Sequence, residues 1–132
     1  MSRPLHRKIQ SEMDLRQVVL ETTRYSMDAG FDETPSRMIG TAVSELGRNI
    51  LKYAGSGECR LRQVKGPDQR GIDMEVKDHG PGIEDLEAAM SDHHSTGGTL
   101  GLGLPGVKRM MDEFDLQSTP GEGTTVTVRK WL

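Results

Sequence analysis

Glycine is concentrated in a few short stretches of this chain, and this concentration constrains the possible fold more than any other sequence feature. Nine of the sixteen glycines lie between residues 80 and 123. They fall in the stretches 78–83, 96–106 and 121–123. Because glycine has no side chain, such stretches form tight turns and let the backbone approach a flat or anionic ligand closely. We therefore expect regular elements joined by glycine loops, some of which contact a ligand.

Between these stretches the sequence predicts helices mixed with strands that local turns join. Thr34 and Pro35 predict the start of a helix over 35–53. Its apolar residues fall on one arc at helical spacing: Ile39, Ala42, Val43, Leu46, Ile50 and Tyr53. The other expected elements are strands 5–10, 59–64, 71–77 and 125–129, and helices 14–29 (capped by Asp14, ended by Gly30), 83–90 and 105–114. This order favours an α+β sandwich over a series of βαβ units.

Length and composition indicate one compact, cytoplasmic domain covering residues 1–132. The formal net charge of −3 argues against a dedicated nucleic-acid binder. Cys59 is the only cysteine, so an internal disulfide is impossible and a reducing compartment is favoured. We interpret Cys59 as a small apolar residue rather than a catalytic thiol. No apolar stretch suggests a signal peptide or approaches the ~20 residues that span a bilayer.

The helix predicted over 35–53 carries polar residues that share one face at the edge of the apolar arc. Glu45, Asn49 and Lys52 recur at i, i+4 and i+7. An amide oxygen suits Mg²⁺, and a carboxylate one turn away can accept a proton from a hydroxyl. Taken alone, an ordinary solvated face with a Glu–Lys pair explains the triplet better. Gly47 in the same helix suggests close approach of a backbone or a ligand, although chance also explains it.

The stretch Asp78-His79-Gly80-Pro81-Gly82 directly follows a predicted strand. An aspartate at a strand end can accept a hydrogen bond from an exocyclic amine such as that of adenine. The alternative is a plain surface turn, since these residue types form turns in any case.

The stretch from Thr96 to Gly106 leads into a predicted helix. Exposed N–H groups near a helix N-terminus favour a phosphate, and the polar segment 91–100 before it has the composition of a loop or lid. Gly101, Gly103 and Gly106 match the dinucleotide fingerprint GxGxxG literally. No strand precedes them and too few residues follow for a βαβ unit, so we set that interpretation aside.

These three elements, with a last turn at Gly121-x-Gly123-Thr124, together resemble the GHKL superfamily of ATP-binding domains. Glu45-x-x-x-Asn49 resembles its N box, Asp78-x-Gly80-x-Gly82 its first glycine box, and Gly101-x-Gly103-Leu104 its second. Each motif alone is weak, but four in this order span nearly the whole chain. Stretches 44–50, 78–83 and 103–114, and the ending Lys130-Trp131-Leu132, resemble the anti-sigma-factor type of serine/threonine kinase, closest to the switch kinases of bacterial stressosomes.

The resemblance implies a two-layer sandwich in which helices cover one face of a mixed, mostly antiparallel sheet and ATP lies between the layers. It implies that Glu45 is the general base, that Asn49 ligates Mg²⁺ and that Asp78 contacts the adenine amine. Gly80 and Gly82 make room for the base, Thr124 supports it, and Gly101 and Gly103 lie at the phosphates. The expected set of ATP-contacting residues is Asn49, Lys52, Asp78, Gly80, Gly82, Ile83, Thr99, Gly101, Gly103, Leu104 and Thr124.

The resemblance also implies a partner, a STAS-domain protein that carries the acceptor serine or threonine, with a PP2C-type phosphatase or a sigma factor as further candidates. Neither nucleic acid nor a membrane is expected as a partner. The alternative function is an ATP-dependent binding module whose output is partner binding rather than phosphotransfer. Glu45 favours the enzyme, because a pure binder needs no base there.

Overall fold

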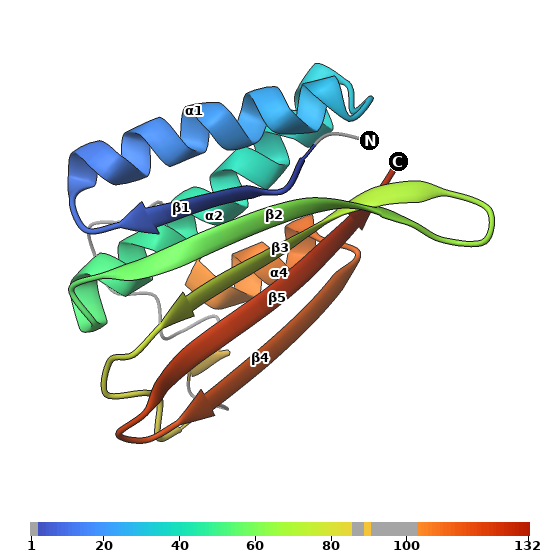
Figure 1. The fold of residues 1–132 in the computed structure, drawn as a ribbon. Coiled ribbons are helices and arrows are strands. Elements are labelled where there is room, and N and C mark those ends of the chain that lie inside the picture. Colours follow the sequence, from blue (N-terminus) through green and yellow to red (C-terminus); the bar gives the residue numbers. More distant parts are fainter. Residues whose placement is uncertain (1–2, 86–88, 91–102) are drawn as a thin grey trace.

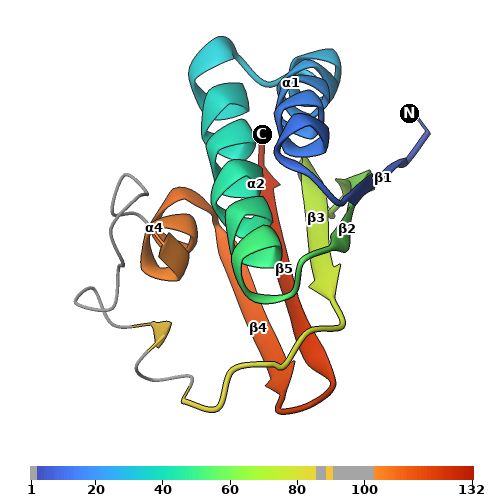
Figure 2. The ribbon, with the colours of Figure 1, turned by 90° about the vertical axis from the view of Figure 1, so that its left-hand side faces the viewer.

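The computed structural model describes residues 3–85, 89–90 and 103–132. In chain order the elements are β1 (Leu5–Ile9), α1 (Glu12–Asp28), α2 (Glu33–Tyr53), β2 (Gly57–Lys65), β3 (Arg70–Asp78), α4 (Gly103–Met110), β4 (Glu113–Thr119) and β5 (Gly123–Trp131). The strands form one sheet in the order β1-β2-β3-β5-β4 (Figure 1). Helices α4, α2 and α1 lie side by side against one face of it (Figure 2).

The predicted α+β sandwich is therefore confirmed, and all four strand pairings are antiparallel. The core lies between the sheet and the helices. Alternate residues of the strands face it, and so do the predicted apolar residues of α2 with one exception. Tyr53 is 54% exposed and lies outside the core. The main contributors are Ile39, Val43, Leu46, Ile50, Leu61, Ile72, Met74, Val76, Val126 and Val128.

The N-caps of the first two helices lie three and two residues before the predicted ones. Ser11, not Asp14, is the N-cap of α1, and its Oγ accepts a hydrogen bond from the Asp14 N–H (3.1 Å). The Asp14 carboxylate instead accepts from the Gln10 N–H (3.0 Å). Helix α2 begins at Glu33 with Asp32 as N-cap, so Pro35 occupies its third position. Gly30 ends α1 as predicted, with a φ of +111°.

The predicted helix over 105–114 is wrong at both ends, because α4 covers Gly103–Met110 and a strand follows it. Lys130 on β5 donates a hydrogen bond to the carbonyl oxygen of Met110 (2.8 Å), the last residue of α4. The Asp112 N–H then bonds to the carbonyl of Arg129 (2.9 Å) and turns the chain into β4. The helix expected over 83–90 is only partly described, and the segment 91–100 lies outside the described residues.

Close packing of α1 on α2 accounts for Gly47. A Cβ built on Gly47 would lie 2.2 Å from a δ-carbon of Leu15, which is buried. The glycine therefore lets the two helices approach each other, and the structure offers no sign of a ligand at this position. In the described part of the chain, no helix is both long and apolar enough to cross a bilayer.

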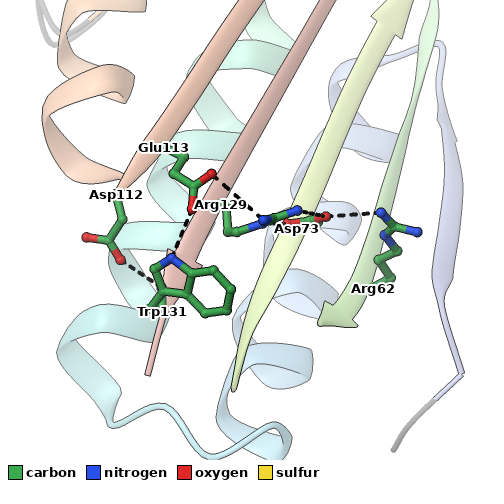
Figure 3. Close-up of polar contacts among 6 residues, drawn as sticks. All are labelled: Arg62, Asp73, Asp112, Glu113, Arg129 and Trp131. Carbon is green, nitrogen blue, oxygen red and sulfur yellow. Dashed lines mark hydrogen bonds and ion pairs between the residues drawn. The ribbon is translucent and has the colours of Figure 1, made fainter. Parts of the chain in front are cut away.

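A row of ion pairs crosses the sheet on the face that the described helices leave open (Figure 3). Asp73 on β3 lies opposite Arg129 on β5 and opposite Arg62 on β2. Arg129 donates to both carboxylate oxygens of Asp73, and Arg62 donates to one of them (3.2 Å). Burial by itself raises the pKa of Asp73, but the hydrogen bonds and charges of Arg129 and Arg62 outweigh it and hold the pKa below its ordinary value.

The end of β5 is tied to β4 beside this row (Figure 3). The indole N–H of Trp131 donates to Glu113 (2.9 Å), and its backbone N–H donates to Asp112 (2.7 Å). The Arg129 guanidinium lies 5.3 Å from the centroid of the Trp131 ring. Four strands are thus joined by side chains as well as by their backbones.

We predict that Asp73→Asn destabilises the fold by ~1.5–3 kcal/mol at pH 7, the usual worth of a hydrogen bond to a charged group. The pKa of Asp73 is lower in the folded chain than in the unfolded one. Its contribution is therefore complete above the unfolded value of about 3.9 and is lost as the pH falls through the folded value. Urea unfolding followed by circular dichroism at pH 7 and near pH 3 measures both effects.

The matched control is Glu75→Gln, which removes an exposed carboxylate from the same strand and the same face. Its stability should match that of the wild type at both pH values. An Asp73→Asn penalty that is absent at pH 7, or that does not shrink in acid, contradicts the assignment.

Candidate functional site

Two glycine loops meet at the end of the sheet where β3 stops and β5 begins (Figure 1). The Gly121 N–H donates to the carbonyl oxygen of Pro81 (2.7 Å). A Cβ on Gly82, which has a φ of +78°, would lie 2.5 Å from the carbonyl oxygen of Thr119. The positive φ and the close approach of Thr119 both require a residue without a side chain at Gly82. The two loops therefore form one rigid unit.

Asp78 lies at the centre of this unit and is half-buried. Its Oδ1 accepts hydrogen bonds from the N–H groups of Gly80 (2.9 Å) and Thr124 (3.3 Å). No residue in the described part of the chain donates to its Oδ2. The carboxylate is thus oriented through one oxygen, and the other can accept a hydrogen bond from a ligand.

Ser118 is the residue of this unit that sequence reasoning missed. Its Oγ accepts from the Ile83 N–H (2.7 Å), donates to the carbonyl oxygen of Gly123 (3.2 Å), and lies 2.8 Å from the Oγ1 of Thr124. A polar residue at a half-buried position of an alternating strand is a usable signal. That signal was lost because β4 was not predicted.

The end of α2 adjoins the same unit through Gly80. A Cβ on Gly80 would lie 2.5 Å from the Cβ of Ala54, the residue that caps α2. Contact with α2 and with the β4–β5 turn therefore explains both glycines without any need to leave room for a base. Tyr53, the neighbour of Ala54, exposes its ring here, with the Lys52 Nζ 5.2 Å from the ring centroid. An exposed aromatic ring beside the loop makes Tyr53 a candidate that the sequence analysis placed in the core instead.

The polar face of α2 runs toward this end of the sheet. Glu45 is 5% exposed, Asn49 is half-buried and Lys52 is exposed. Neither Arg48 nor Lys52 forms an ion pair with Glu45 in the described part of the chain. A solvated Glu–Lys pair therefore does not describe this face, because Glu45 is buried at the edge of the core.

Helix α4 packs on α2 and begins at Gly103, whose φ of +51° favours glycine. Leu104 is buried beneath it. Of the residues predicted to contact ATP, Thr99 and Gly101 lie outside the described residues, and their roles stay predictions.

Two other chemistries have no support among the described residues. Cys59 is buried, which raises the pKa of its thiol to about 12 and leaves it protonated at neutral pH. No three residues of the His, Cys, Asp and Glu types gather closely enough to hold a metal ion in the described ranges. The interpretation of Cys59 as an apolar residue is therefore confirmed.

Comparison with known proteins identifies the family of this chain. The model of the histidine kinase-like ATPase domain matches residues 10–130. The chain belongs to this family. The GHKL resemblance predicted from four short motifs is thereby confirmed, and with it an ATP-binding domain.

Individual members of this family show which kinds of protein the chain is similar to. The chain is 43% identical over 125 residues to the serine/threonine-protein kinase RsbT of Bacillus subtilis, covering 95% of this chain and 94% of that protein. It is 35% identical over 98 residues to the anti-sigma F factor of Thermoanaerobacter sp. strain X514, covering 71% and 68%. In fold it resembles the RsbU and RsbW domains of Rv1364c from Mycobacterium tuberculosis, with a TM-score of 0.66 and 18% identity over 98% of this chain and 32% of that one.

The described residues fit the nucleotide that this ATPase family binds. Asp78 offers an oriented acceptor oxygen, which suits the exocyclic amine of adenine and not the carbonyl oxygen of guanine at the same place. Asn49 offers an amide oxygen on a face of α2 beside a buried carboxylate, and Mg²⁺ commonly combines such oxygens with those of substrate phosphates.

We predict that Asp78→Asn weakens ATP binding at least tenfold while the fold stays stable. Asparagine keeps an oxygen for the N–H groups of Gly80 and Thr124, but its NH₂ group cannot accept the adenine amine. Loss of a hydrogen bond to a charged group costs ~1.5–3 kcal/mol, which is tenfold or more in affinity. Calorimetry with ATP, beside a thermal unfolding curve, measures both quantities.

Asp78→Ala serves as the comparison, since it removes both oxygens and should lower stability as well as affinity. Unchanged ATP affinity in folded Asp78→Asn would mean that Oδ2 of Asp78 does not contact the nucleotide.

Proposed function

We propose that this chain is a serine/threonine protein kinase that transfers the γ-phosphate of ATP to a hydroxyl group of a STAS-domain protein. The observation that carries the proposal is the buried position of Glu45, one helical turn before Asn49, with no ion-pair partner for Glu45 among the described residues. Alignment with the kinase RsbT over 95% of this chain supports it. A module that only binds its partner has no use for such a group.

We assign the predicted residues other than Gly80 and Gly82 to parts of the proposed site. Asp78 receives the adenine amine and Thr124 supports that side. Ile83 is assigned to the adenine side as well, where its N–H donates a hydrogen bond to Ser118. Lys52 at the end of α2, with Gly103 and Leu104 at the start of α4, is assigned to the phosphates, as are Thr99 and Gly101. Asn49 is assigned to Mg²⁺.

Bound ATP with Mg²⁺ supplies the phosphoryl group and the charge that neutralises it during transfer. The chain's own residues position the reactants and move one proton. The acceptor hydroxyl oxygen bonds to the γ-phosphorus while the bond to the ADP oxygen breaks. The hydroxyl proton passes to the Glu45 carboxylate, and a positioned base of this kind contributes ~10²–10⁴-fold.

A second function has support from the similarity to anti-sigma F factors. In that alternative the chain binds a sigma factor or a phosphatase, and ATP mainly sets its shape. The two functions predict different results for Glu45, because a binding module does not depend on a base.

We predict that Asn49→Ala abolishes the dependence of ATP binding on Mg²⁺. In the wild type, chelation of Mg²⁺ should weaken binding clearly, because the metal joins the protein amide to the phosphates. In the variant, titrations with Mg²⁺ and with EDTA should give the same affinity. Arg37→Ala, an exposed change in the first turns of α2, should keep the wild-type response. A Mg²⁺ response retained by Asn49→Ala refutes the metal assignment.

We predict that Glu45→Gln phosphorylates a STAS-domain partner at least a hundredfold more slowly than the wild type. Glutamine preserves the size and the hydrogen-bonding capacity of Glu45 but cannot take up the proton. ATP affinity and partner binding should stay near normal, because neither needs a base. Single-turnover transfer from labelled ATP to purified STAS proteins, with calorimetry for ATP, measures the three properties separately.

Near-normal transfer by Glu45→Gln means that positioning and metal suffice, and that Glu45 is not catalytic. Absence of transfer by the wild type with every STAS partner, together with tight partner binding, favours the binding module.

A further inference from the structure

A groove of about 390 Å³ lies between α1 and α2 and has no part in the proposed nucleotide site. Leu15, Val19 and Leu20 of α1 form its apolar part. Its polar lining consists of Glu12 and Arg16 of α1 and Ser44 and Arg48 of α2. The two helices that build the groove lie side by side in Figure 2.

The apolar part of the groove has a buried floor and an exposed rim. Leu15 is buried against Gly47, where the two helices touch. Leu20 is 67% exposed, and Met13 and Met27 are also exposed, seven residues before and after it. Residues seven apart lie on nearly the same side of a helix. An exposed stripe of this kind, continuous with a groove, is typical of a helix-binding surface.

The charge of the groove selects the chemistry of its occupant. Arg16 and Arg48 are both exposed and come from different helices. Neither guanidinium group has a hydrogen bond or an ion pair with a residue in the described part of the chain. Glu12 also lines the groove, so the lining carries two positive charges and one negative charge. An apolar floor with this net positive charge is complementary to a segment that combines apolar side chains with carboxylates.

A second copy of this chain fits the surface poorly. The stripe of Met13, Leu20 and Met27 is symmetric about Leu20, so two copies of α1 related by a two-fold axis would cross there in antiparallel directions. Residue i of one copy would then face residue 40 − i of the other. Arg16 would face Arg24, and Glu12 would face Asp28. Like charges at both pairs oppose this dimer.

We propose that the groove binds an acidic amphipathic helix of a partner protein. Apolar side chains of the partner helix pack on Leu15, Val19 and Leu20, and its carboxylates pair with Arg16 and Arg48. The α1 segment from residue 12 to residue 20 is about 12 Å long at 1.5 Å per residue, so two to three turns of partner helix suffice. The proposal rests on the groove alone and not on the proposed kinase activity.

Two labelled helical peptides of about 14 residues, stabilised by an internal lactam, test it by fluorescence anisotropy with the full chain. Both carry leucine at i, i+3, i+7 and i+10, and one has glutamate where the other has lysine. Because the chain has a net charge of −3, its overall field favours the lysine peptide. We expect the opposite order, with the glutamate peptide binding saturably and at least tenfold more tightly.

Variants at exposed positions distinguish binding in the groove from the effect of the overall charge of the chain, and they leave the core unchanged. Arg16→Glu combined with Arg48→Glu should reverse the preference between the peptides, and Leu20→Ser should weaken the glutamate peptide at least threefold. Lys65→Glu, an equal change of charge per site on an exposed strand end, should leave both affinities unchanged. Three results would each overturn the proposal. They are equal binding of the two peptides, no saturable binding of the glutamate peptide, and an unaltered preference in the double variant.

Discussion

The close approach of β5 to the end of β3 is the constraint on which the candidate site depends. A Cβ on Gly123 would lie 2.2 Å from the carbonyl oxygen of Asp78, so only glycine lets the two strands meet there. That approach brings the Thr124 N–H to the Asp78 carboxylate and fixes its orientation. It also brings the β4–β5 turn against Pro81 and Gly82. The two glycine loops around Asp78 are therefore held in place by the sheet itself.

Helix α2 serves three surfaces at once, which explains its unusual sequence. Its apolar arc packs on the sheet, and the arc is interrupted by Gly47 so that α1 can approach. Glu45 lies at the buried edge of that arc, while Arg48 faces the groove. Glu45 is 5% exposed, whereas Arg48 and Lys52 are exposed. Burial thus separates Glu45 from the charged residues around it.

The sequence predicted most of the fold, because glycine and helical periodicity are local signals. The glycine pairs at 80–82 and 121–123 marked the loops that meet, and the apolar arc marked α2. The strand β4 was missed because its alternation is weak: Phe114, Leu116 and Ser118 are only half-buried, and Asp115 and Gln117 lie between them. The end of α4 depends on Lys130, twenty residues away in the chain, and no local pattern reveals such a contact.

The same limit applies to the candidate site. Asp78 was predicted from its position at a strand end. Which of its two oxygens accepts hydrogen bonds from the protein depends on Thr124, which is distant in sequence. Ser118 was overlooked because its three contacts come from two separate loops. Tyr53 fitted the apolar arc by periodicity, but it is the last residue of α2 and is 54% exposed. Its exposure became visible only from the tertiary arrangement.

Strand β5 connects the two halves of the site through its helix-facing residues. Thr124 at its start orients Asp78, and Lys130 near its end holds the last carbonyl of α4. At about 3.4 Å per residue these two contacts lie about 20 Å apart on one strand. On the opposite face, Arg129 and Trp131 fasten the same strand to its neighbours. Because a paired central strand is rigid, β5 holds the loop at Asp78 and the end of α4 at a fixed spacing. The ion pairs on the open face of the sheet contribute to that spacing from the side away from the helices.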